Sequence, residues 1–77
     1  MNYLLNKDLS LEAKGFMALA SHLKDGGIRV DYLVLEHYLK EHRRQIKNIV
    51  KELESHGYIV LNYDTDEAYI YNEGIKE

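Results

Sequence analysis

Cysteine is absent from the 77-residue chain, which excludes a disulfide framework, a cysteine-ligated zinc site and thiol catalysis. Proline is absent as well, so glycine and short polar clusters must separate the elements. No apolar run approaches the roughly 20 residues that a membrane-spanning helix needs. The first residues also lack the basic start and long apolar stretch of a signal peptide. We therefore expect a cytoplasmic protein with no membrane partner.

The composition is typical of a small folded protein, because 45% of the residues are hydrophobic and 30% are charged. A chain of this length makes one domain at most. We predict a single domain over residues 1–77, with its core at about residues 9–72 and a tail or linker start at residues 73–77. The net charge of −3 argues against general coating of nucleic acid, so any such binding must be local.

The first segment with the apolar spacing of a helix lies between Ser10 and Lys24. Its apolar residues recur at spacings of three and four: Ala13, Phe16, Ala20 and Leu23. Ser10 can cap the start of this helix, and the two glycines of Asp25-Gly26-Gly27 can end it, because glycine tolerates the left-handed conformation of a helix stop. Residues 28–30 predict a short extended strand after it.

Two further helices are predicted on either side of a tight turn at residues 40–42. Asp31 can cap the second helix, which runs from Tyr32 to about Leu39. The third helix runs from about residue 43 to residue 56 and ends at Gly57. Its apolar residues have the spacing i, i+3, i+4, i+7 of a single helix face: Ile46, Ile49, Val50 and Leu53.

After Gly57 the residue pattern changes from the helical period to an alternation of period two, which is typical of β-strands. Residues 58–63 and 68–72 are rich in β-branched and aromatic residues, and the four residues from Asp64 to Glu67 separate these runs, which predicts a β-hairpin. The fold class is therefore α+β. Three helices followed by a C-terminal hairpin wing match a winged helix-turn-helix domain.

Half of the positive charge of this acidic chain lies within twelve residues. Residues 40–51 carry five of the ten lysines and arginines, and one acid, Glu41. If the aliphatic residues of the third helix face the core, Arg43, Lys47 and Lys51 lie mostly on its outer surface as i, i+4 neighbours, which weakens the helix by a few tenths of a kcal/mol for each pair. An ordinary solvated helix face is one explanation, and an anionic partner is the other.

The order of the elements favours the anionic partner, namely double-stranded DNA. Arginine and lysine can contact phosphates and guanine, while asparagine and glutamine can contact adenine. We expect the third helix to enter the major groove. The residues predicted to contact DNA are His42, Arg43, Arg44, Gln45, Lys47, Asn48 and Lys51.

Two segments carry a resemblance to a known family. Residues 9–19, LSLEAKGFMAL, resemble the opening of the winged-helix domain at the N-terminus of DnaD-like primosomal proteins and of phage and plasmid replication initiators. Residues 43–60, RRQIKNIVKELESHGYIV, resemble its recognition helix and first wing strand. The resemblance covers about residues 9–71. It implies a part in phage, plasmid or bacterial DNA replication or in transcription regulation.

Two features depart from that family's pattern. Lys40 stands where such domains usually have glycine. A non-glycine residue in a left-handed turn costs roughly 1 kcal/mol, so we expect a turn of another shape. The hairpin tip carries Asp64, Asp66 and Glu67 where a wing that follows phosphates has lysine or arginine. We therefore expect the tip to point away from DNA or to contact protein.

The seven tyrosines are an excess, and several lie on the hairpin. If the aliphatic residues of the two strands face the core, the tyrosines between them tend to point outward. Outward tyrosines suit a protein interface, and they equally suit cross-strand pairing within the hairpin. The alternative function is a protein–protein interaction module, with a second copy or a replication or transcription protein as partner. Its candidate interface residues are Tyr58, Tyr69, Tyr71 and Asp66.

Other chemistry finds little support in the sequence. The four histidines lack metal-site spacing, so ordinary surface or half-buried histidines are favoured, and His42 alone has a second role as a phosphate or base contact. Gly26-Gly27 lacks the strand and the Lys-Ser/Thr of a phosphate loop. The serines have no nucleophile-elbow setting. We expect no enzyme activity, no cofactor and no metal.

Overall fold

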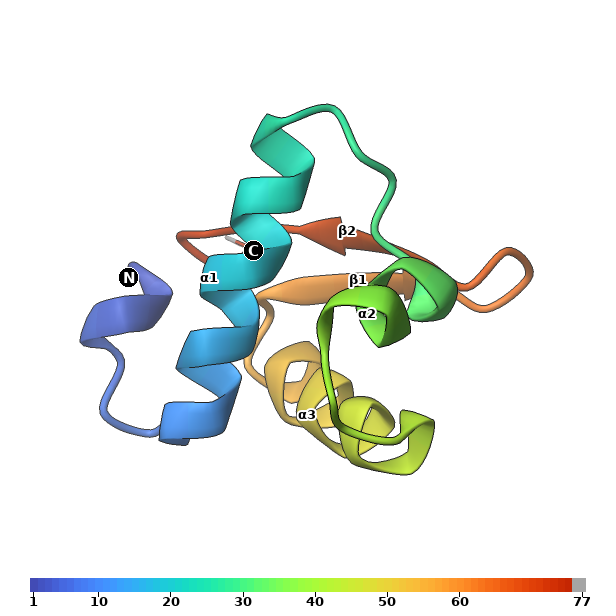
Figure 1. Ribbon diagram of the computed structural model, residues 1–77. Helices are drawn as coiled ribbons and strands as arrows, with labels where there is room; N and C mark the ends of the chain where they lie inside the picture. Colours follow the sequence, from blue (N-terminus) through green and yellow to red (C-terminus); the bar gives the residue numbers. More distant parts are fainter. Residues whose placement is uncertain (76–77) are drawn as a thin grey trace.

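The computed structural model describes residues 1–75 of the chain (Figure 1). Three α-helices are followed by a two-stranded antiparallel hairpin, so the α+β class predicted from the sequence is confirmed. A short 3₁₀ helix, η1, precedes them and was not expected. The elements are η1 (Tyr3–Leu5), α1 (Leu11–Asp25), α2 (Tyr32–Tyr38), α3 (Arg43–Ser55), β1 (Ile59–Asn62) and β2 (Glu67–Ile70).

The first two helices start at the side-chain caps that the sequence predicts. Ser10 Oγ accepts a hydrogen bond from the amide of Ala13 at 3.1 Å, at the start of α1. Asp31 Oδ1 accepts from the amide of Val34 at 2.9 Å, at the start of α2. Each cap satisfies an amide that has no partner within its own helix.

Glycines in the left-handed conformation end α1 and α3, also as predicted. Gly27 has φ 76° and Gly57 has φ 80°. After α1, the amide of Ile28 donates to the carbonyl of Leu23 at 2.9 Å, and the same pattern of bonds follows α3 around Gly57. This is the geometry in which a left-handed residue lets the chain turn back over the last carbonyls of a helix.

The turn between α2 and α3 avoids the left-handed conformation. Leu39, which ends α2, is extended at φ −112° and ψ 142°. Among residues 1–75, Asp66 is the only residue other than glycine with a positive φ. Lys40 therefore needs no strained backbone, and the prediction of a different turn shape is confirmed.

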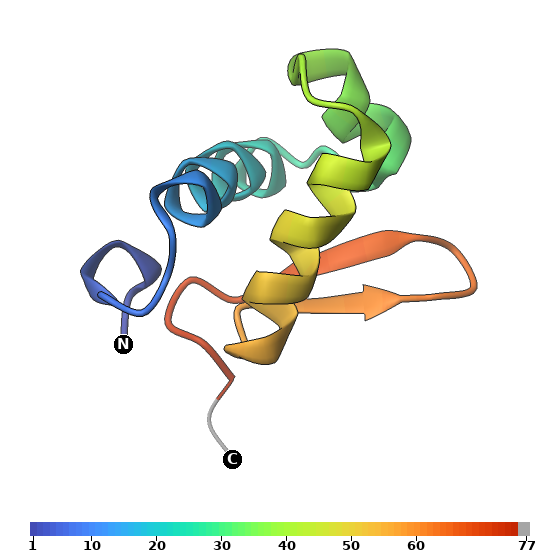
Figure 2. The ribbon, with the colours of Figure 1, turned by 90° about the horizontal axis from the view of Figure 1, so that it is seen from below.

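The hairpin forms as predicted, but its loop begins and ends one residue earlier than the sequence predicts. Ile59 pairs with Ile70, and Asn62 with Glu67, so Glu67 belongs to β2 and the loop consists of residues 63–66. Asp66 closes this loop at φ 58°, and its amide donates to the carbonyl of Asn62 at 2.7 Å. In Figure 2 the loop projects beyond the helices.

The short strand expected at residues 28–30 does not form. The carbonyl of Val30 accepts a hydrogen bond from the amide of Ala68 at 2.7 Å, as in a strand that pairs with β2. The backbone groups that would form the next hydrogen bond of this pairing have other partners. The amide of Ile28 takes part in the stop of α1, and the carbonyl of Ile70 accepts from Lys24 Nζ at 2.8 Å. Residues 28–30 therefore connect α1 to α2 without forming a third strand.

A single apolar cluster joins the helices to the hairpin. Helix α3 packs against both α1 and β1, while α1 also contacts β2 (Figures 1 and 2). The most deeply buried large side chains of this cluster are Met17, Leu35, Ile46, Val50, Leu53 and Ile59.

Both ends of the described chain pack onto this core. Tyr3 is buried, and its amide donates to the carbonyl of Asn72 at 3.0 Å, so the core extends beyond the predicted range of residues 9–72. The amide of Ile75 donates to the carbonyl of Gly57 at 2.8 Å. The start of the predicted tail or linker, residues 73–75, is thus joined to the fold by this bond, and residues 76–77 lie outside the described residues.

Candidate nucleic-acid interface

The inner face of α3 determines where its charged residues lie. Ile46, Val50 and Leu53 are buried, and Ile49 is half-buried. The predicted inward turn of these four side chains is thus confirmed. The basic residues of α3 are all exposed: Arg43, Arg44, Lys47 and Lys51.

The face of α3 opposite the core carries Arg44, Asn48 and Lys51. Their spacing of four and three residues places them on one side of the helix, and all three are exposed. Within residues 1–75, none of these side chains forms an ion pair or a hydrogen bond. This outer face, the residues Arg44, Asn48 and Lys51, is available to an anionic partner.

The flank of α3 that faces α2 is partly occupied by the protein's own groups. Arg43 forms an ion pair with Glu36. The guanidinium of Arg43 lies 5.4 Å from the ring centre of Tyr32, and Lys47 Nζ lies 5.6 Å from it. Cations at these distances from an aromatic face are attracted by about 0.5–1 kcal/mol at exposed sites. Tyr32 thus positions two predicted contact residues, a role that sequence spacing did not show.

The hairpin loop adds negative charge beside the same flank. Tyr63 donates through its hydroxyl to the two carboxylate oxygens of Glu54, at 3.0 and 2.9 Å, and this bond raises the pKa of Tyr63. Burial raises the pKa of Tyr32, and so does the charge of nearby Asp66. Asp66 also lines a small groove of about 210 Å³ together with Lys47. The charge of this flank is therefore largely balanced within the fold.

Gln45 and His42 cap the start of α3. Gln45 Oε1 accepts a hydrogen bond from the amide of His42 at 3.0 Å, which satisfies an amide just before the first turn. The predicted role of Gln45 in reading a base would require this cap to open. His42 is exposed and stands at the N-cap position.

The hairpin tyrosines divide into two kinds. Tyr69 and Tyr71 are 43% and 42% exposed, and the neighbouring Val60 is 39% exposed. Tyr58 is only 2% exposed, so its predicted place at an outward interface is wrong. Its hydroxyl donates to the carbonyl of Met1 at 2.8 Å, because the N-terminal segment covers it.

Within residues 1–75, no group of three histidine, aspartate or glutamate side chains could hold a metal ion. No helix among these residues is long and apolar enough to cross a membrane. Comparison of the chain with protein-family models, with curated proteins and with solved structures found no match.

Proposed function

We propose that the chain is a winged helix-turn-helix domain that binds double-stranded DNA through α3. The order of three helices and a C-terminal hairpin supports this assignment, as does the resemblance of residues 9–19 and 43–60 to the winged-helix domains of replication proteins. A part in phage, plasmid or bacterial replication or in transcription regulation, in the cytoplasm, belongs to the same proposal.

The outer face of α3 is the observation that carries the proposal. Arg44 and Lys51 are exposed cations without a carboxylate partner among residues 1–75, and Asn48 lies between them. In the proposed complex the two cations contact phosphates, and Asn48 contacts an adenine edge in the major groove. Arg43 and Lys47 lie at the flank beside Tyr32 and serve as secondary contacts.

The direct test removes the two outer cations. Arg44→Ala with Lys51→Ala should weaken binding to a random duplex roughly tenfold or more, as measured by fluorescence anisotropy over a series of salt concentrations. The slope of log affinity against log salt should become shallower by about 1.8, because each phosphate contact contributes about 0.9.

The matched control removes two cations from another part of the surface. Lys7→Ala with Lys14→Ala changes the net charge by the same amount at the N-terminal segment and α1. The control should bind nearly as the parent does. Equal affinity of the parent and the α3 double variant would overturn the proposal, and equal losses in the two double variants would show that only net charge matters.

A protein-interaction module is the second candidate function. The specific observation in its favour is the exposed surface of Tyr69 and Tyr71 beside Val60 on the outer side of the hairpin, with Asp66 at the loop. In this alternative the partner is a second copy of the chain or a replication or transcription protein. Loss of partner binding on changing Tyr69 and Tyr71, with DNA binding absent, would favour it.

A further inference from the structure

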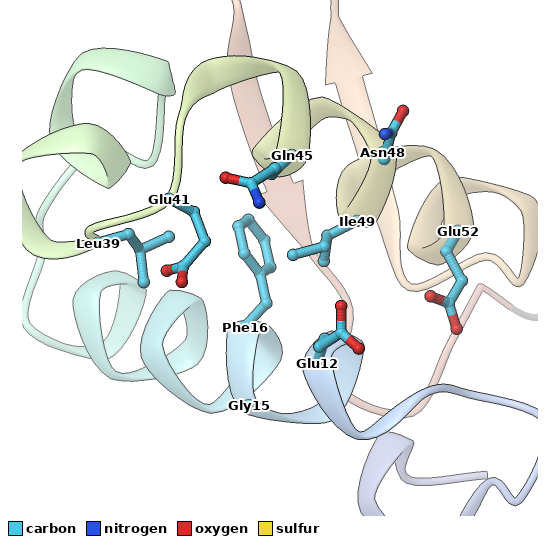
Figure 3. A pocket seen from close by; sticks show the side chains of 9 residues that line it. All are labelled: Glu12, Gly15, Phe16, Leu39, Glu41, Gln45, Asn48, Ile49 and Glu52. Carbon is cyan, nitrogen blue, oxygen red and sulfur yellow. The ribbon is translucent and has the colours of Figure 1, made fainter.

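An open groove of about 590 Å³ lies between α1 and α3 (Figure 3). It borders the flank of α3 that carries Gln45 and Glu52, and not the flank that holds Arg43 and Lys47 against Tyr32. The turn that joins α2 to α3 borders one end of the groove through Leu39 and Glu41. The volume falls within the range of about 300–1,000 Å³ that is typical of ligand sites in proteins. The groove is not visible in the sequence, because its lining residues come from three separate segments.

The floor of the groove is apolar. Phe16 stands between the two helices, and Leu39 and Ile49 flank it and are half-buried (Figure 3). Gly15 lies beside them, in the middle of α1. A Cβ at Gly15 would meet no atom within 4 Å, so packing within the fold does not require a glycine there. Glycine inside a helix costs about 1 kcal/mol relative to alanine, and its missing side chain leaves the groove open.

The rim of the groove is acidic. Glu12 and Glu41 extend carboxylates over the floor (Figure 3), and within residues 1–75 neither carboxylate forms an ion pair or a hydrogen bond. The third acid, Glu52, is engaged, because its oxygens accept from the amide and hydroxyl of Ser10 at 2.7 and 2.8 Å. Two unpaired carboxylates above an apolar floor complement an occupant that is both cationic and aliphatic.

We propose that this groove binds a segment of a partner protein that carries aliphatic side chains next to lysine or arginine. The aliphatic side chains would pack on Phe16, Leu39 and Ile49, and the cations would pair with Glu12 and Glu41. An amphipathic helix laid in an apolar groove is a common form of such recognition. DNA does not fit as the occupant, because the acidic rim repels it. The outer face of α3 in a second copy of the chain does not fit either, because it lacks aliphatic residues.

This docking site is independent of DNA binding. The groove and the outer face of α3 lie on different sides of the helix, and Asn48 at their border points away from the groove floor (Figure 3). The proposal would stand even if α3 did not bind DNA.

The test uses the full chain and a defined probe. The probe is a synthetic amphipathic peptide of leucine and lysine, and binding is followed by the backbone amide signals of the ¹⁵N-labelled chain. Two comparison peptides replace all leucines by serine or all lysines by glutamate. The leucine–lysine peptide should shift the amide signals of Phe16 and Ile49. Both comparison peptides should bind at least about tenfold more weakly, because one lacks the aliphatic side chains and the other lacks the cations.

Matched variants locate the binding surface. Glu12→Gln with Glu41→Gln should weaken peptide binding about tenfold or more. Asp64→Asn with Asp66→Asn removes the same charge from the hairpin loop and should change it less than about twofold. Gly15→Leu places a side chain in the open groove and should abolish binding, while thermal denaturation should show a fold at least as stable, because leucine is the better helix former.

Several outcomes would overturn the proposal. Absence of peptide binding at millimolar concentration is one. Equal weakening by the two double variants is another, because it would reduce the effect to net charge. Unchanged peptide binding by Gly15→Leu would show that the peptide sits elsewhere.

Discussion

Tyr58 is the residue at which both ends of the described chain meet the hairpin. Its hydroxyl donates to the carbonyl of Met1 and accepts from Asn6 Nδ2 at 3.1 Å. On the other side, a Cβ at Gly74 would lie 3.6 Å from its ring, so this stretch passes close over the tyrosine. The alternation of a strand places Tyr58 on the side opposite Ile59, and the chain ends then bury it.

Removal of this hydroxyl should destabilise the protein. Tyr58→Phe leaves the Met1 carbonyl and the Asn6 amide without their partner, so we expect the free energy of unfolding to fall by about 1–2 kcal/mol. Urea denaturation measures this change. Tyr71→Phe is the control, since Tyr71 is exposed and its hydroxyl makes no hydrogen bond within residues 1–75. This variant should stay within about 0.5 kcal/mol of the parent. Equal losses in the two variants would contradict the importance of the Tyr58 bonds.

At the scale of elements, α3 has two different flanks. The flank beside α2 holds Arg43 and Lys47 against Tyr32, and the flank beside α1 borders the acidic groove. The hairpin loop is tied to the first flank by the bond between Tyr63 and Glu54. Among the elements within residues 1–75, none covers the outer face between these flanks.

The bond between the hairpin loop and α3 should depend on pH. Tyr63 can donate to Glu54 only while it is protonated, and its pKa is raised above 10.0 by that bond, by some burial and by the charge of Glu54. The contribution to stability is therefore complete below the unfolded pKa of about 10 and is lost as pH rises through the raised pKa. The stability difference between the parent and Tyr63→Phe, measured by urea denaturation, should shrink over that alkaline range.

Glu54→Gln is the matching control for this effect. Without the carboxylate, the pKa of Tyr63, measured from its ring carbon signals by NMR, should fall towards 10.0. An unchanged pKa of Tyr63 in this variant would show that the hairpin loop does not contact α3 in solution.

At the scale of the whole molecule, the fold is closed by segments far apart in sequence. Ser21 Oγ donates to Asn72 Oδ1 at 2.6 Å, and Tyr3 joins the same region through its buried side chain and its backbone. A chain of 77 residues has a small core, so each such contribution is a large fraction of its stability.

Truncation of Tyr3 should therefore affect the entire fold. Tyr3→Ala exposes the apolar site under η1, and we expect a loss of about 2–3 kcal/mol. In thermal denaturation this corresponds to a fall in Tm on the order of 10 °C for a domain of this size. Leu5→Ala, at a side chain that is 75% exposed, should leave Tm nearly unchanged. A Tyr3 variant as stable as the parent would show that η1 is dispensable for the core.

Much of the fold could be predicted because its signals are local. The apolar spacing in α1 and α3, the caps at Ser10 and Asp31 and the glycine stop at Gly57 each depend on residues within one or two turns of the chain. Helix periodicity also predicts that the cations of α3 face away from the core.

The remaining features depend on contacts between distant segments, which periodicity does not encode. Burial of Tyr58 requires Met1 and residues 72–75 to pass over the hairpin, and the attraction of Arg43 to Tyr32 requires α2 to fold back beside α3. The groove arises for the same reason, because α1 and the α2–α3 turn bring Glu12 and Glu41 beside Ile49. Residue types and spacing therefore place the basic helix, whereas packing between elements decides which of its cations stay free and what lies on either side of them.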